Sequence, residues 1–209
     1  MIGQTIGRKF ARLATNAAVR NPGVWRLFRP LIRWQFDSLA SVWASMQLED
    51  SLASYEAGLE ALPAPPAHAL DLGTGTGAGA VAIARRFPAA AVVGADLSDA
   101  MLAEARRRLP DELRARVEFQ RADASALPFA DGAFELVAHA NMIPFFDELT
   151  RVLAPGGHAL FAFSGGPTTP IYVTPGTLRA ELERRGFTDF AELAAGRGNG
   201  LLARKGDHA

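Results

Sequence analysis

LDLGTGTGAG, residues 70–79, is the stretch that decides the fold of this 209-residue chain. It joins an apolar run over 67–72 to a helix-like segment over 78–87. Glycines suit such a loop because the chain turns sharply and a ligand can approach the backbone with no Cβ in the way. The loop ends at a helix N-terminus, where free N–H groups favour negative charge. Asp96 ends the next apolar run, 21 residues beyond Gly75, and is placed to accept both hydroxyls of an adenosine ribose.

The chain beyond this loop alternates between strand-like and helix-like segments. Ser98 is expected to cap the helix after the second strand, and another helix is expected at 175–185. Further strands are expected at 90–95, 115–120, 133–139, 157–163, 187–194 and 199–204. This alternation predicts an α/β fold, with a parallel sheet covered by helices on both faces.

The proline-rich stretch LPAPP, residues 62–66, suits neither a helix nor a central strand. It predicts a boundary between an N-terminal helical extension or lid, residues 1–62, and a domain over residues 63–209. The extension has apolar residues at helical spacing. Because Pro22 and Pro30 should break or kink it, we expect two or three short helices rather than one long helix.

Charge is unevenly distributed, although the formal net charge is zero. Residues 1–36 hold seven bases and no acid, whereas the rest of the chain holds 15 bases and 22 acids. Such an arm indicates either an anionic partner or a basic segment folded onto an acidic body.

Several functional classes are excluded or disfavoured by composition. The chain has no cysteine, which excludes disulfides and thiolate metal sites, and its four histidines lack metal-ligand spacing, so we expect no metal. No apolar run is long enough to span a membrane. Basic residues interrupt any N-terminal signal peptide, and we therefore expect a cytoplasmic protein.

The glycine loop alone fits two cofactor classes. GTGAGA, residues 75–80, also matches the G-x-G-x-x-A fingerprint of dinucleotide-binding proteins, so an NAD-dependent oxidoreductase is an alternative. That class predicts a Tyr-x-x-x-Lys pair or a second large domain. Neither Tyr55 nor Tyr172 is followed by such a lysine.

Residues 67–205 resemble the class I S-adenosylmethionine-dependent methyltransferases, in their small-molecule, type 11/25-like branch. LDLGTGTG resembles the first motif of that family, GADLSDAMLAEAR the second and RADASALPF the third. AFELVAHAN and RVLAPGGHALFAF resemble the fourth and fifth strands. GFTDFAELAAGRGNGLLARK resembles the closing antiparallel hairpin, which typical dinucleotide-binding domains lack.

The resemblance implies a Rossmann-like, seven-stranded, mostly parallel sheet with a C-terminal antiparallel hairpin, and S-adenosyl-L-methionine as cofactor. Asp96 would hold the ribose, Asp123 the adenine amino group, and the backbone of Ala124 a ring nitrogen. The other implied cofactor-binding residues are Asp71, Gly73, Thr74, Gly75, Gly77, Leu97, Met101 and Asn141. Asp71 has two readings: a carboxylate that attracts a sulfonium and an ammonium group, or one that braces the loop or caps the helix.

The acceptor side is less defined. Only 17 positions separate Phe134 from Arg151, so the intervening helix should be brief or absent, and 141–149 is expected to form a loop near the acceptor. His139 is a weak candidate for a general base; the alternative is a strand-ending residue that bonds the backbone. By the resemblance, residues 34–55 would form part of the acceptor wall, which includes Trp34, Phe36, Trp43, Met46 and Tyr55.

We expect an unidentified small-molecule acceptor rather than nucleic acid. A nucleic-acid methyltransferase docking through the basic arm is an alternative, and so is a cofactor-binding protein without catalysis. Peripheral membrane contact through the arm is a further expectation. The sequence favours no oligomeric state.

Overall fold

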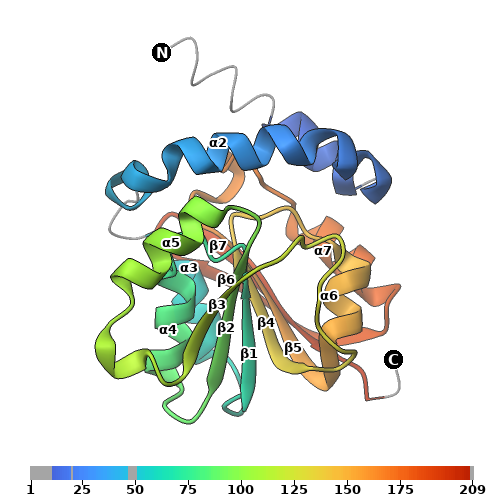
Figure 1. Ribbon diagram of the computed structural model, residues 1–209. Helices are drawn as coiled ribbons and strands as arrows, with labels where there is room; N and C mark the ends of the chain where they lie inside the picture. Colours follow the sequence, from blue (N-terminus) through green and yellow to red (C-terminus); the bar gives the residue numbers. More distant parts are fainter. Residues whose placement is uncertain (1–10, 20, 47–50, 208–209) are drawn as a thin grey trace.

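A central sheet lies between two layers of helices in the computed structural model, which describes residues 11–19, 21–46 and 51–207 (Figure 1). The seven strands are β1 (His68–Leu72), β2 (Ala91–Asp96), β3 (Val117–Arg121), β4 (Phe134–Ala140), β5 (Leu153–Phe163), β6 (Phe187–Ala195) and β7 (Gly198–Lys205). Their order is β3-β2-β1-β4-β5-β7-β6. The first five strands are parallel, and β7 pairs antiparallel with both β5 and β6. The predicted fold class, including the closing hairpin, is confirmed.

Alternation along the strands builds a separate core on each face of the sheet. In β4, Leu136 and Ala138 face the layer of α3 (Ala53–Glu60), α4 (Ala78–Arg86) and α5 (Asp99–Arg108). Val137 points to the opposite face, which α6 (Phe146–Val152) and α7 (Pro175–Glu183) cover. The 3₁₀ turns η2 (Asp111–Leu113) and η3 (Gly166–Thr168) lie in connections. Both layers therefore exclude water from the strands that end at the glycine loop.

Local capping positions the helices as the sequence predicts. The hydroxyl oxygen of Ser98 accepts a hydrogen bond from the Met101 N–H at 3.1 Å, which starts α5 directly after β2. Thr174 caps α7 in the same way through the Thr177 N–H at 3.2 Å. The predicted helix at 175–185 and the Ser98 cap are thus confirmed.

The N-terminal region differs from its prediction. A helix covers residues 11–19, η1 spans Pro22–Val24, and α2 then runs unbroken from Trp25 to Met46, for 22 residues. Pro30 lies inside α2, so the expectation of only short helices was wrong here. Its missing N–H affects the second turn alone, and the Arg26 carbonyl left without that donor belongs to an exposed residue that water can reach.

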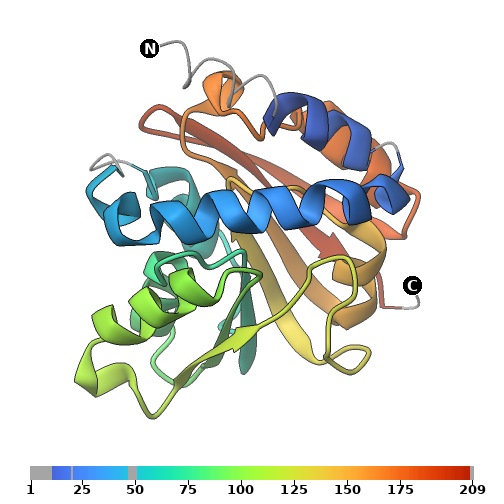
Figure 2. The same ribbon diagram turned by 45° about the horizontal axis from the view of Figure 1, so that its top comes forward.

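The proposed boundary after residue 62 does not coincide with a break in packing. Tyr55 and Leu59 of α3 are buried in the same core cluster as Leu136 and Leu160 of the sheet. Helix α2 instead lies outside both sheet-facing layers and crosses above the carboxyl ends of the strands (Figure 2). No helix in the described ranges is both long and apolar enough to cross a membrane.

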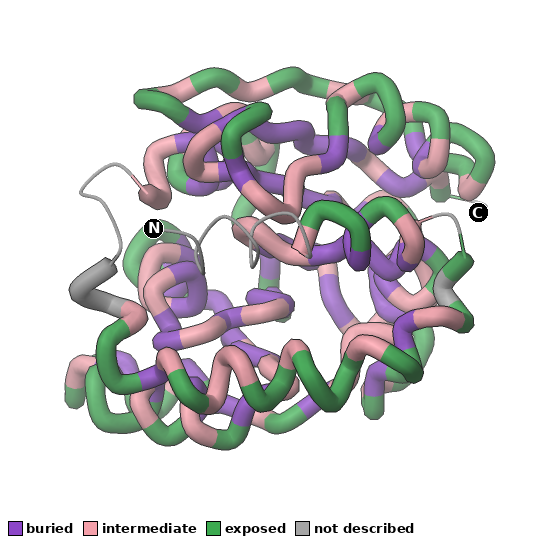
Figure 3. Tube along the Cα trace, turned by 90° about the horizontal axis from the view of Figure 1, so that it is seen from above, coloured by how far each residue is buried: buried purple, intermediate pink, exposed green. Residues whose placement is uncertain are grey.

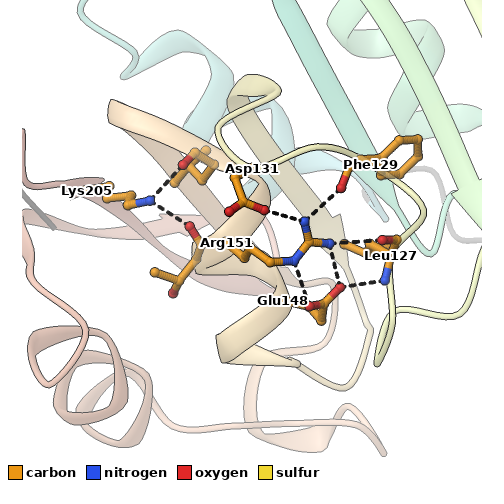
Figure 4. A network of polar contacts seen from close by, with 8 residues as sticks. Leu127, Phe129, Asp131, Glu148, Arg151 and Lys205 are labelled. Carbon is orange, nitrogen blue, oxygen red and sulfur yellow. Dashed lines mark hydrogen bonds and ion pairs between the residues drawn. The ribbon is translucent and has the colours of Figure 1, made fainter.

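The short connection between β4 and β5 is held by a polar network that the sequence did not indicate (Figure 4). The Arg151 guanidinium donates to Glu148 at 2.9 Å, to Asp131 at 2.8 Å, and to the carbonyls of Phe129 and Leu127 at 2.7 and 2.9 Å. Glu148 in turn accepts from the Leu127 N–H at 2.6 Å. The loop between β3 and β4 is therefore anchored to α6. At seven residues, α6 is the brief helix that was expected. The loop expected over 141–149 is shorter than predicted, because residues 146–149 already belong to this helix.

Candidate functional site

The loop between β1 and α4 has the backbone that its glycines predict. Gly73, Gly75 and Gly77 have φ angles of 72°, 52° and 88°, in the left-handed region that favours glycine. A Cβ at Gly77 would lie 2.8 Å from Cζ of Phe119, and one at Gly73 would lie 2.6 Å from the sulfur of Met142. Side chains at these two positions would therefore distort the loop or its neighbours.

Asp71 lies beneath this loop and is almost fully buried. Its carboxylate accepts hydrogen bonds from the Tyr55 hydroxyl at 2.8 Å, the Thr74 hydroxyl at 2.6 Å and the Ala80 N–H. Burial raises the pKa of Asp71 to about 6, and these hydrogen bonds offset only part of that effect. A Cβ at Gly79 would approach Asp71 to 2.6 Å, so the carboxylate fills the space left by that glycine. These contacts show that Asp71 stabilises the conformation of the loop, and the Thr74 hydroxyl contributes to the same set of hydrogen bonds.

Asp96 lies on the other side of the loop, at the end of β2. Its Oδ2 accepts from the Gly75 N–H at 2.9 Å, and its Oδ1 accepts from the Ser98 N–H at 2.9 Å. Burial raises the pKa of Asp96, while hydrogen bonds from Ser98, Gly75 and Leu97 lower it in part. Loop and carboxylate thus meet at the carboxyl edge of adjacent strands, where ligands bind in open α/β sheets.

Asp123, after β3, is held by the N-terminal arm (residues 11–46). Arg29 Nη1 lies 2.7 Å from its Oδ2, and the indole Nε1 of Trp25 donates to its Oδ1 at 2.9 Å. Burial raises the pKa of Asp123, but hydrogen bonds from Arg29, Ser125 and Trp25 outweigh it and leave the pKa below its usual range. At this point the basic arm folds onto the acidic body. The charge imbalance is visible in the sequence, but the pairing of Arg29 and Trp25 with Asp123 is not, because they lie 94 and 98 residues away from it.

A second contact joins the arm to the same edge. The Ser98 hydroxyl donates to Asp37 Oδ1 at 2.6 Å, and the indole Nε1 of Trp43 would lie 3.7 Å from a Cβ at Gly75. Phe36 packs edge-on against Trp43 with ring centroids 5.4 Å apart. Phe36 and Trp43 therefore lie on the inner side of α2, near the loop.

Other residues expected on the acceptor wall lie elsewhere. The Trp34 side chain is 66% exposed on the outer side of α2, and Tyr55 is fully buried beneath Asp71. Burial raises the pKa of Tyr55 well above its usual value, which keeps its hydroxyl a hydrogen-bond donor. The Met46 side chain lies outside the described residues, as does His208.

The remaining residues implied by the resemblance lie at different depths. Asn141 follows β4 with a φ of 52°, and its side-chain oxygen accepts from the Ser164 N–H at 2.9 Å, which ties the ends of β4 and β5 together. Met101 is buried in the core, while Leu97 and Ala124 are half-buried against the cluster that contains Trp25. Only part of the implied set therefore lines the edge.

His139 is fully buried in β4, with its ring edge-on to Phe161 at 4.5 Å between centroids. Neither ring nitrogen has a hydrogen-bond partner among the described residues. Burial lowers the pKa of His139 to about 3, so the ring is neutral at ordinary pH. An imidazole enclosed in this way has no path to an acceptor, and nothing in its surroundings supports a role as base.

A groove of about 1100 Å³ opens beside Asp123, between the start of the arm and the layer of α6 and α7. Phe145 and Tyr172 contribute apolar surface, and Arg12 and Arg26 contribute positive charge. Of the residues that form the edge, Asp123 lines this groove.

Comparison with known proteins finds similarity to methyltransferases. Residues 69–157 match the family described as "Methyltransferase domain". A demethylmenaquinone methyltransferase of Thermus thermophilus is 50% identical over 105 residues, which cover 46% of this chain and 47% of that protein. A malonyl-[acyl-carrier protein] O-methyltransferase of Halorhodospira halophila is 36% identical over 159 residues, or 71% of this chain and 53% of that protein. The chain thus spans about half the length of these relatives.

Solved structures with a similar fold include a complex that contains a putative methyltransferase. A chain of the complex between the Haloferax volcanii Trm112 methyltransferase activator and a putative methyltransferase superposes with a TM-score of 0.68 at 17% identity, over 82% of this chain and 97% of that chain. Residues 69–157 match a methyltransferase domain, and the fold around them has the glycine loop followed by Asp96. These findings support a class I S-adenosylmethionine-dependent methyltransferase of the type 11/25 branch.

Proposed function

We propose that this protein transfers the methyl group of S-adenosyl-L-methionine to a small-molecule acceptor. The observation that carries the proposal is the meeting of Asp96 with the Gly75 N–H, 2.9 Å apart, at the carboxyl edge of β1 and β2. A carboxylate beside a glycine loop at that edge suits the hydroxyls of an adenosine ribose. The family of the chain and the names of its relatives support the same cofactor and reaction.

The shape of the loop fits such a ligand. A Cβ at Gly75 would have only Trp43 within 4 Å among the described residues, so the loop leaves a space that faces α2. Gly73, Gly75 and Gly77 would shape the methionine end of the site, and Asp96 would take the ribose hydroxyls. Asp123 and the backbone of Ala124 would take the adenine, for which Asp123 must exchange bonds now made by the arm.

The cofactor supplies a methyl group activated by a sulfonium. The residues of this chain would supply orientation and exclusion of water, which account for much of the acceleration of an in-line displacement. The carboxylate of Asp96 would add favourable charge near a cationic ligand. A general base is needed only if the acceptor must lose a proton, and His139 is too enclosed to act as one.

The groove beside Asp123 is our candidate for the acceptor space. It combines apolar surface from Phe145 and Tyr172 with Arg12 and Arg26, and neither of these arginines has an acidic partner among the described residues. Such a lining suits an apolar molecule that carries an acidic group. The names of the two relatives, which act on a demethylmenaquinone and on a malonyl group, indicate acceptors of small-molecule character. The cytoplasmic location stays a prediction.

Calorimetric titration with S-adenosylmethionine, S-adenosylhomocysteine and NADH tests the cofactor class. We expect both sulfur ligands to bind, and Asp96→Asn to weaken them by about tenfold or more because a hydrogen bond to a charged group is lost. Asp111→Asn, which alters an exposed acid away from the site, is the matched control and should bind normally. Binding of NADH alone would support the oxidoreductase alternative and overturn the proposal.

Turnover distinguishes an enzyme from a protein that only binds the cofactor. Formation of S-adenosylhomocysteine is followed with a panel of quinones, small carboxylic acids and acyl thioesters, and then with DNA and RNA. We expect turnover with a small molecule, reduced in Asp96→Asn and unchanged in Asp111→Asn. Turnover on nucleic acid alone, with affinity that falls steeply as salt rises, would identify the nucleic-acid alternative instead.

A further inference from the structure

Exposed apolar side chains gather on one part of the molecule. In the ranges that the structure describes, every large hydrophobic side chain that is exposed lies on the N-terminal arm. They are Leu13, Leu27, Leu31, Trp34 and Val42, with exposed fractions from 45% to 78%. Large apolar residues gathered on one surface, rather than scattered singly, commonly mark an interaction site.

Four of these residues form a stripe on α2. Leu27, Leu31 and Trp34 follow one another at spacings of four and three, so they share one face of the helix, and Val42 continues it two turns on. The opposite face of α2 holds Trp25 and the Phe36–Trp43 pair that meet the body. The exposed positions recur along α2 in the view from above (Figure 3). The helix thus has one apolar side bound to the protein and a second that faces solvent.

Positive charge flanks this stripe. Arg26 and Arg33 are both exposed and lie along one side of it by helical position. Arg33 lies 3.5 Å from Asp37, whereas Arg26 has no acidic partner among the described residues. The surrounding sequence adds to this charge, since residues 1–36 contain seven bases and no acid. Exposed Leu and Trp beside arginine is the composition of helices that lie in the interface of an anionic membrane.

We propose that the outer face of α2, with Leu27, Leu31 and Trp34 inserted, docks onto an anionic phospholipid bilayer. The arginines select lipid over a second copy of the chain, because a two-fold contact between stripes would bring like charges together. Trp34 suits the level of the headgroups, where amphipathic rings collect. Since the inner face of α2 covers the edge formed by Gly75, Asp96 and Asp123, docking would turn that edge toward the bilayer. Vesicle binding needs neither cofactor nor acceptor, so its outcome is independent of the proposed methyl transfer.

Flotation of the full chain with vesicles tests the proposal. We expect binding to vesicles of phosphatidylcholine with phosphatidylglycerol, little binding to phosphatidylcholine alone, and loss of binding at high salt. The combined change Leu27→Ser, Leu31→Ser and Trp34→Ser should lower the bound fraction by about tenfold or more, because the inserted apolar surface is removed. All three side chains are at least 49% exposed, so thermal unfolding should be unchanged.

Charge reversal distinguishes an effect of the arginines on α2 from an effect of the net charge of the protein. Arg26→Glu with Arg33→Glu should abolish binding to the anionic vesicles. Arg107→Glu with Arg184→Glu changes the net charge equally at exposed sites on the body and should bind normally. Anionic vesicles should also shift tryptophan emission to the blue, and Trp34→Phe should remove that shift.

Three results would overturn the proposal: no flotation at low salt, flotation that the serine variant retains, or equal loss in both charge-reversed variants. A concentration-dependent dimer in light scattering that the serine changes abolish would assign the stripe to a second copy instead.

Discussion

The arm and the body of this protein use apolar residues in opposite ways. In the body, Leu70, Leu136 and Leu160 are fully buried between sheet and helices. On the arm, Leu27 and Trp34 are more than half exposed. A small apolar cluster with Trp25 and Phe145 attaches the arm to the body, together with hydrogen bonds that involve Asp123 and Ser98. The body is therefore held by two large cores, whereas the arm is held by one small cluster and a few bonds to residues that are also candidates for cofactor binding. That difference lets the arm move without unfolding the domain.

The same substitution in the two regions tests this contrast most strongly. Leu160→Ala removes a fully buried side chain from β5 and should lower the free energy of unfolding by about 3 kcal/mol, through lost burial and a cavity. Leu27→Ala removes a side chain that is 78% exposed and should change it by less than about 0.5 kcal/mol. Urea denaturation measures both. Equal losses would mean that the arm is part of the cooperative core.

Asp71 gives the stability of the body a dependence on pH. Its folded-state pKa is raised from 3.8 to about 6, so the folded protein binds its proton more tightly than the unfolded chain does. Stability from this group is therefore present at low pH and decreases as pH rises from about 4 to about 6, by on the order of 3 kcal/mol. Asp71→Asn should remove this decrease. An unchanged pH profile of the unfolding free energy in the variant would contradict the assignment.

The Arg151 network predicts an intermediate effect within the body. Arg151→Ala should remove the guanidinium donor from Glu148 and from the carbonyls of Leu127 and Phe129, at a cost of about 2 kcal/mol. Arg114→Ala, which removes an exposed ion pair, is the control and should cost less than about 0.5 kcal/mol. Thermal unfolding compares the two variants, and similar shifts would show that the anchor contributes no more than a surface pair.

The smallest expected effect concerns the attachment of the arm. Arg29→Ala removes an ion pair to Asp123 whose arginine side chain is 45% exposed, so global stability should fall by less than about 1 kcal/mol. Hydrogen exchange should nevertheless become faster in α2 while β1 and β4 keep their protection, because only the arm opens more often. Faster exchange across the sheet would show that arm and body open together.

Local chemistry is what the sequence by itself determined. The glycine loop, the Ser98 cap, the strand alternation and the place of Asp96 were all predicted, because each depends on backbone conformation or on a spacing of a few residues. The brief helix between β4 and β5 followed from chain length alone.

Tertiary structure decided the rest. Helical periodicity shows that Leu27, Leu31 and Val42 share a face, but only the packed molecule shows that this face meets solvent. Composition indicates a basic arm, but only the fold brings Arg29 to Asp123, 94 residues away. Likewise, the position of His139 near a strand end suggests a base, whereas the packed molecule buries its side chain completely in the core. Residues distant in sequence determine which face of a helix is covered and which charged side chains form ion pairs. A local sequence pattern contains no information about these distant residues.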